Sequence, residues 1–135
     1  MAISNHFQRV AKYSVYDSAY PERVDQAYVT FALAVRDAAI TSAPSTLSEL
    51  AIVLPRGWYR RQRALDVVVL GSFRRPPRVI LQVARLLAPI YLESGILPIV
   101  QPVVTREWLK AEETESEPFA RVRERGILAF TRALQ

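Results

Sequence analysis

The clearest pattern along the chain is the helical spacing of its apolar residues. Between Val24 and Ala38 the apolar positions recur at helical intervals, which predicts an amphipathic helix over residues 22–40 with Pro21 just before its first turn. Two further helices are predicted nearer the C-terminus. They cover Val79–Leu92, with a bend at Pro89 and an end at Gly95, and residues 117–125, which Gly126 ends.

Short apolar runs between these helices predict β-strands. Leu50–Leu54 and Leu65–Leu70 are two such runs, and the β-branched valines of the second favour a strand buried on both faces. Ile96–Val104 predicts a third strand, which its prolines place at an edge of the sheet or at a bulge. Ile127–Phe130 predicts a last strand.

The connections between these segments set the expected topology. Because the residues from Leu65 to Val104 run strand, helix, strand, the two strands are expected to be parallel. The short polar link Pro55–Arg63 allows the first two strands to pair antiparallel. Three other segments are predicted to be loops or linkers: Thr41–Ser45, Gly71–Pro77 and the acidic run Glu112–Glu117.

Length and composition fit one globular domain. The 135 residues are enough to bury a single core, and 50% apolar with 23% charged residues is an ordinary balance for such a protein. We therefore predict an α+β fold, a small mixed sheet flanked by helices, over residues 21–135. An arm or a short helix is expected over residues 1–20.

Composition also excludes several classes of protein. The absence of cysteine excludes disulfides, thiolate metal sites and thiol nucleophiles. No apolar stretch approaches the roughly 20 residues that span a bilayer, and the N-terminus lacks the features of a secretory signal. We expect a cytoplasmic protein that does not bind a membrane.

Arginine is concentrated in the middle of the chain. The formal net charge is +5, and between Leu50 and Leu92 the only acid among many arginines is Asp66. The candidate binding residues are Arg56, Trp58, Tyr59, Arg60, Arg61 and Arg63, which share one turn, together with Arg74 and Arg75 after the next strand. Such a mixture suits stacked single-stranded bases on a phosphate backbone, and it equally suits a protein interface.

Several strings of the sequence resemble minimal nucleotidyltransferases of the DNA polymerase β superfamily. They are Leu65–Leu70, Tyr91–Val100, Thr105–Trp108 and the closing segment Glu117–Ile127. The resemblance covers roughly residues 22–130 and is stronger in the second half of this range than in the first. It implies a nucleotidyltransferase-like fold, with the family's order of strand, turn, strand, helix and strand.

The same resemblance implies an active site that has lost most of its acids. In the family, two aspartates at alternate positions of one strand face the same side and, with a third acid, hold two divalent cations around a nucleoside triphosphate. Here Asp66 matches the second aspartate, Ala64 stands at the first, and the third acid would fall near Gln101 or Val103. The family's Gly-Ser turn is replaced by the run that begins at Pro55. Asp66 would therefore bind magnesium, and the chain a nucleoside triphosphate, only if the protein were active.

Three functions follow as hypotheses. The first is a non-catalytic binding or regulatory subunit, antitoxin-like or a component of a complex, with a helical or acidic protein partner. The second is an active nucleotidyltransferase that a partner chain completes and that modifies a protein or RNA acceptor. The third is a module that binds RNA or single-stranded nucleic acid. Assembly into a homo-oligomer is compatible with each of them.

Overall fold

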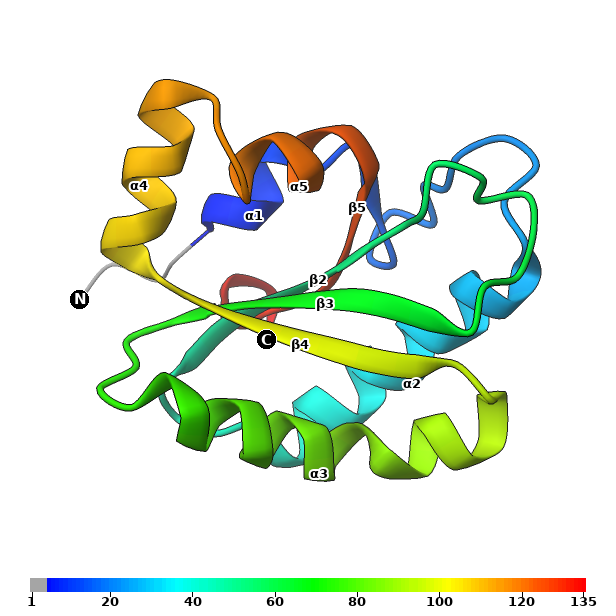
Figure 1. The fold of residues 1–135 in the computed structure, drawn as a ribbon, viewed down its shortest axis with the longest axis horizontal. Coiled ribbons are helices and arrows are strands. Elements are labelled where there is room, and N and C mark those ends of the chain that lie inside the picture. Colours follow the sequence, from blue (N-terminus) through cyan, green and yellow to red (C-terminus); the bar gives the residue numbers. More distant parts are fainter. Residues whose placement is uncertain (1–4) are drawn as a thin grey trace.

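A five-stranded mixed sheet in the order β1-β5-β2-β3-β4 organises the molecule (Figure 1). The computed structural model describes residues 5–135. The strands are β1 (Tyr13–Ser14), β2 (Leu47–Val53), β3 (Ala64–Gly71), β4 (Leu97–Val104) and β5 (Gly126–Thr131). The helices are α1 (His6–Val10), α2 (Gln26–Ser42), α3 (Pro76–Ser94), α4 (Thr105–Thr114) and α5 (Phe119–Arg125), with a 3-10 turn at Arg132–Leu134. The expected α+β class with a mixed sheet flanked by helices is confirmed.

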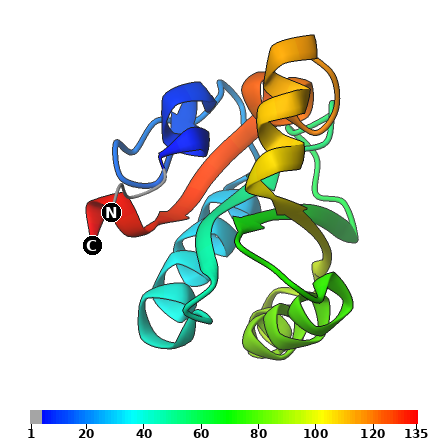
Figure 2. The ribbon, with the colours of Figure 1, turned by 90° about the vertical axis from the view of Figure 1, so that its left-hand side faces the viewer.

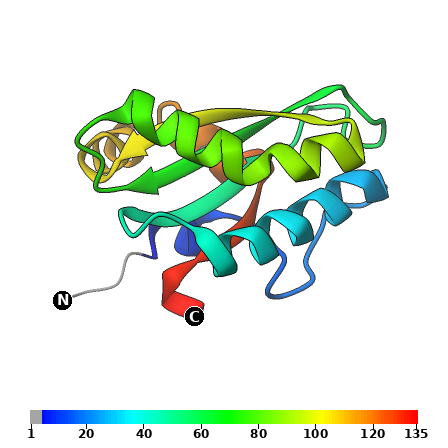
Figure 3. The same cartoon turned by 90° about the horizontal axis from the view of Figure 1, so that it is seen from below.

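Helices cover the sheet on both sides. α2 and α3 lie side by side against one face, and α1, α4 and α5 lie on the other (Figures 2 and 3). Along β3, Leu65, Val67 and Val69 belong to the core on the α2 and α3 side. Val68 and Leu70 alternate with them and belong to the core on the opposite side. β3 is therefore buried on both faces, as its valines predicted.

The strand pairing follows the predicted connections. β2 pairs antiparallel with β3, β3 pairs parallel with β4, and β4 is an edge strand. Leu97 donates its N–H to the carbonyl of Arg63 at 2.8 Å, so residues in step with Leu97 direct their N–H groups toward β3. Pro98 and Pro102 are each an odd number of residues from Leu97, so an N–H at either position would point away from the sheet. Neither proline therefore removes a hydrogen bond between β3 and β4.

The strand nearest the C-terminus lies inside the sheet. β5 pairs antiparallel with β2 and parallel with β1, and all of its residues are buried. The N-terminal segment, for which an arm or short helix is expected, supplies both α1 and the edge strand β1. Phe7 of α1 is fully buried, so this helix contributes to the core on the α4 and α5 side.

The first long helix has different ends from those predicted. α2 begins at Gln26 rather than at residue 22, because Asp25 is its N-cap and accepts the N–H of Ala27 at 2.9 Å. The helix then continues to Ser42, into the segment predicted as a loop. An aspartate before an apolar run was thus a better start signal than the proline four residues earlier.

The second long helix also begins earlier than predicted. α3 starts at Pro76, inside the predicted loop. A helix can begin at a proline because an N–H in the first turn would have no partner within the helix, so its absence costs nothing. Pro89 lies within the helix, and Gly95 follows its end in the left-handed conformation with φ 75°, as predicted. None of the helices within residues 5–135 is long and apolar enough to cross a membrane.

One helix, α4, was not predicted from the sequence. α4 takes up the first part of the acidic run Glu112–Glu117, for which a linker was predicted. Trp108 fixes this helix, since it is fully buried between Phe7 and Phe119, with ring centroids 4.8 and 5.6 Å away. The pattern was too weak to recognise because α4 buries only Trp108 and Ala111.

Candidate functional site

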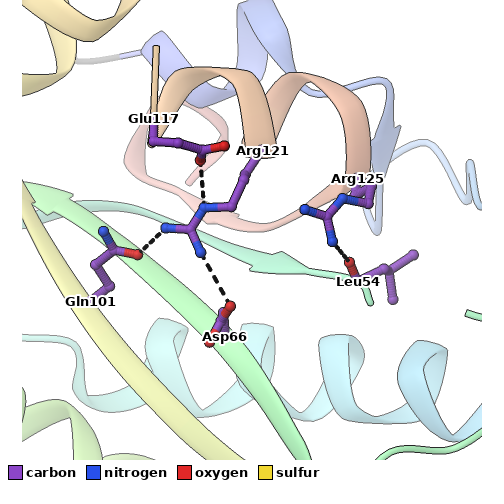
Figure 4. Close-up of polar contacts among 6 residues, drawn as sticks. All are labelled: Leu54, Asp66, Gln101, Glu117, Arg121 and Arg125. Atoms are coloured by element: carbon purple, nitrogen blue, oxygen red, sulfur yellow. Dashed lines mark hydrogen bonds and ion pairs between the residues drawn. The ribbon is translucent and has the colours of Figure 1, made fainter. Parts of the chain in front are cut away.

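Asp66, the acid that the sequence singles out, lies near the start of β3 on the face that α5 covers (Figure 4). Its Oδ2 forms a hydrogen-bonded ion pair with Nη1 of Arg121 at 3.2 Å. Ala64 lies two residues earlier on the same face and brings no oxygen ligand. The carboxylate is thus neutralised by a side chain of the protein itself.

Arg121 is the centre of a polar group on this face. Its Nε donates to Oε2 of Glu117 at 2.6 Å, and its Nη2 donates to Oε1 of Gln101. The three acceptors come from β3, from β4 and from the residue pair that precedes α5 (Figure 4). We call Asp66, Gln101, Glu117 and Arg121 the Arg121 cluster. Because acceptors meet the planar guanidinium from three directions, the side chain is held in one orientation.

A second arginine of α5 lies one turn further on. Phe119 and Val122 anchor α5 in the core, and Arg121 and Arg125, four residues apart, share the side of the helix that meets the sheet. Nη1 of Arg125 donates to the carbonyl of Leu54 at 2.9 Å. Its Nε is buried and has no hydrogen-bond partner within residues 5–135.

A pocket of about 210 Å³ opens between these two groups. It is lined by Val53, Leu54, Pro55, Ala64, Leu65, Asp66, Ile99 and Arg125, and we call it the Asp66 pocket. Ile99 and its neighbour on the same face, Leu97, are 49% and 46% exposed, so no helix within residues 5–135 covers this part of β4. The pocket is smaller than the roughly 300–1,000 Å³ that is usual for small-ligand sites.

The described residues offer no cluster of carboxylates for a cation. Within residues 5–135, no group of three or more histidine, cysteine, aspartate or glutamate side chains is placed to hold a metal ion. Glu117, the other carboxylate of the Arg121 cluster, binds a different edge of the guanidinium from Asp66. A magnesium ion beside Asp66 would therefore be close to the positive charge of Arg121, which repels it.

The turn Pro55–Arg63, called here the basic turn, uses its two aromatic side chains differently. Trp58 packs against the core, and its Nε1 donates to the carbonyl of Glu22 at 3.0 Å. Tyr59 is 58% exposed, and the guanidinium of Arg60 lies 5.5 Å from its ring centroid. Trp58 anchors the turn, and Tyr59 is the aromatic surface that a ligand can reach.

Tyr28 of α2 fastens the other half of the basic turn. Its hydroxyl donates to the carbonyl of Arg60 at 2.8 Å and accepts the N–H of Gln62 at 2.7 Å. Burial raises the pKa of Tyr28 above the usual tyrosine value. In the sequence this residue is only an apolar position of a helix, so its role in holding the turn was not predicted.

The structure places the predicted arginines on two separate surfaces. Four of them are exposed around the basic turn: Arg56, Arg60, Arg61 and Arg63. Arg74 and Arg75 are exposed beyond the opposite end of β3, whose 8 residues span roughly 25 Å. In the part of the chain that the structure describes, none of these six arginines forms an ion pair.

The sequence pattern did not single out Arg121 and Arg125. Their spacing of four residues was a usable signal, because it places two charges on one side of a short helix. The sequence did not show which strand this side of the helix packs against, because that depends on tertiary packing. Comparisons with protein-family models, with curated proteins and with solved structures gave no match to the chain.

Proposed function

We propose that the chain is a non-catalytic binding subunit with a nucleotidyltransferase-like core. The observation that carries this proposal is the ion pair of Asp66 with Arg121, in which a guanidinium lies beside the carboxylate that would have to bind a cation. Nucleotidyl transfer needs two divalent cations to hold the triphosphate and the attacking oxygen. With Ala64 in place of a second carboxylate, binding a partner is the better supported role.

The partner in this proposal is a protein that presents an acidic group. Arg125 lines the Asp66 pocket, and no carboxylate within residues 5–135 forms an ion pair with it. Leu97 and Ile99 expose apolar surface on the same face. An acidic side chain next to an apolar one would satisfy both features, and arginine beside apolar surface is typical of interface centres.

An assay of nucleotide transfer tests the loss of catalysis. The purified chain is incubated with labelled nucleoside triphosphates, Mg²⁺ and protein or RNA acceptors. We expect no transfer, and Asp66→Asn is expected to change nothing, like the control Glu113→Gln at an exposed acid of α4. Magnesium-dependent transfer that Asp66→Asn abolishes and Glu113→Gln preserves would contradict the proposal. The same result in a complex isolated with its partner would favour an enzyme that the partner completes.

The acidic partner is tested on the α5 arginines. Arg125→Gln is expected to weaken the complex by at least about tenfold, because the partner's carboxylate loses a charge-assisted hydrogen bond. Arg123→Gln is the matched control, since Arg123 is exposed on the same helix and pairs with Glu115. Equal affinity of the two variants, measured by calorimetry on the isolated complex, would exclude the Asp66 pocket as the docking site.

A second candidate function is binding of RNA or single-stranded nucleic acid by the basic turn. The exposed ring of Tyr59 beside Arg60, among further exposed arginines, favours it, since bases stack on such rings while guanidinium groups contact phosphates. Titration with single-stranded RNA at several salt concentrations tests this function. Each phosphate-contacting arginine that is replaced should reduce the slope of log K against log salt by about one. Binding that is absent or independent of salt would exclude it.

A further inference from the structure

The end of β3 away from Asp66 carries a second concave surface. It is a cavity of about 420 Å³ at the loop that leads from β3 into α3. Figure 1 shows the course of this loop. Its lining residues are Thr46, Ser72, Phe73, Arg74, Arg75, Arg78, Val79 and Gln82. We call it the arginine cavity. The proposed docking of a partner at the Asp66 pocket makes no use of it.

The backbone that carries these arginines is fixed by the sheet. Ser72 donates its N–H to the carbonyl of Thr46 at 3.0 Å, which ties the loop to the residue before β2. Gly71 packs so closely against the same carbonyl oxygen that a Cβ would lie 2.1 Å from it. Phe73 is buried and forms part of the cavity wall. The loop is therefore formed before any ligand binds, which reduces the entropic cost of binding.

Positive charge in the cavity is uncompensated. Within residues 5–135, no carboxylate lines the cavity, and its three arginines, Arg74, Arg75 and Arg78, form no ion pair. The first turn of α3 contains no acid either. Three guanidinium groups around one hollow create a local potential that favours a multiply charged anion.

Side chains, and not the amides of the helix, are the donors that such an anion would find. Pro76 and Pro77 have no N–H, and the N–H of Arg78 already donates to the carbonyl of Arg75 at 3.0 Å. The planar fork of a guanidinium matches two oxygens of a phosphate group at once. This fork suits carboxylate as well as phosphate, and the three positive charges favour phosphate because a phosphate group carries more negative charge than a carboxylate.

We propose that the arginine cavity binds a small molecule that carries a diphosphate group. A phosphate monoester has a charge of about −2, so three guanidinium groups are better balanced by two linked phosphates. Phe73 and Val79 provide an apolar wall for the organic part of the ligand. The cavity volume falls within the roughly 300–1,000 Å³ of small-ligand sites, which favours a small molecule over a nucleic-acid backbone. The site is independent of the Asp66 pocket, which lies at the other end of β3.

Calorimetric titration of the full chain with inorganic pyrophosphate at physiological salt tests the proposal. We expect saturable binding that is tighter than that of orthophosphate, because pyrophosphate engages more guanidinium groups. Arg75→Gln and Arg78→Gln should each weaken pyrophosphate binding by at least about tenfold. Arg85→Gln removes the same charge from an exposed position of α3 outside the cavity, and its affinity is expected to match that of the natural chain.

Three results would overturn the proposal. The first is the absence of pyrophosphate binding at millimolar concentration. The second is equal weakening by Arg85→Gln, which would show attraction to net charge alone. The third is binding of single-stranded RNA that Arg75→Gln and Arg78→Gln weaken and that pyrophosphate does not displace. That result would identify a nucleic-acid surface.

Circular dichroism is the control for folding. Since the substituted arginines are exposed, the spectra of the variants are expected to match that of the natural chain.

Discussion

At the scale of single residues, charge neutralisation within the protein decides what the sheet face beside α5 can bind. The side chains of Arg121 and Asp66 are 23% and 41% exposed, so water screens their attraction in part. Gln101 and Glu117 hold the guanidinium in place, which lowers the entropic cost of the pair. The pair thus has a modest effect on stability and a large effect on which ions approach Asp66.

A double-mutant cycle on Asp66→Ala and Arg121→Ala measures this pair. We expect a coupling free energy of about 0.5–1 kcal/mol, at the upper end for exposed pairs, because the guanidinium has further acceptors. Urea unfolding of the natural chain, the two single variants and the double variant gives the value. The more exposed pair of Arg123 with Glu115 serves as the comparison and should give a smaller coupling. Additive effects at Asp66 and Arg121 would show that the two side chains do not interact in solution.

The buried hydroxyl of Tyr28 predicts how stability depends on pH. Its folded pKa is raised, so above the ordinary tyrosine value of about 10 the folded state binds more protons than the unfolded state, and stability falls as pH rises. Tyr28→Phe should lose about 1–2 kcal/mol at pH 7, because the carbonyl of Arg60 and the N–H of Gln62 lose their partner.

The measurement is urea unfolding of the natural chain and the Tyr28→Phe variant at neutral pH and just above the ordinary tyrosine value. The difference between the two proteins should shrink at the higher pH. Burial also raises the pKa of Tyr16 and of Tyr20, so the variant should keep part of the dependence on pH. An identical loss of stability with pH in both proteins would contradict the role assigned to Tyr28.

At the scale of helices and strands, α4 is anchored by one aromatic side chain, Trp108, which contacts both Phe7 and Phe119. Trp108→Ala should destabilise the fold by about 3–5 kcal/mol, because it leaves a cavity between Phe7 and Phe119. Trp108→Phe should cost less than about 1.5 kcal/mol, since a phenyl ring leaves a much smaller cavity and the buried Nε1, which has no partner within residues 5–135, is removed. Thermal and urea unfolding compare the two. Equal losses would show that Trp108 does not anchor α4 by packing.

Elements with a strong local pattern were predictable, and those without one were not. α3 and β3 could be predicted from the spacing of their own apolar residues, and Gly95 indicates the end of a helix because glycine readily adopts the left-handed conformation. α4 buries too few side chains to give a recognisable helical pattern. The place of β5 between β1 and β2 depends on contacts between residues far apart in the sequence. The candidate site likewise has one residue that the sequence pattern singles out and one that it does not. Asp66 stands out in an apolar strand, but its partner Arg121 is 55 residues away and no local pattern connects them.

At the scale of the whole molecule, both edges of the sheet are protected against pairing with another chain. β1 has only 2 residues, and β4 has prolines at two positions where an N–H would point outward. Replacing Pro98 and Pro102 together with threonine should restore these donors and cause association that increases with concentration. Sedimentation velocity measures it, with Pro77→Ala in the exposed first turn of α3 as the control. Unchanged sedimentation of the double variant would show that the prolines do not protect this edge.

The position of β5 also limits the order in which the chain can fold. Its neighbours β1 and β2 both precede it in sequence, and the pairing of Tyr13 with Ile127 closes a very long loop. β2, β3, α3 and β4 can associate earlier, because they follow one another closely. During that interval the apolar strand Leu47–Val53 has an unpaired side that can meet another unfinished chain. Aggregation should therefore be most severe before Gly126–Thr131 is inserted into the sheet, and a chain that ends before this segment lacks an inner strand rather than an edge.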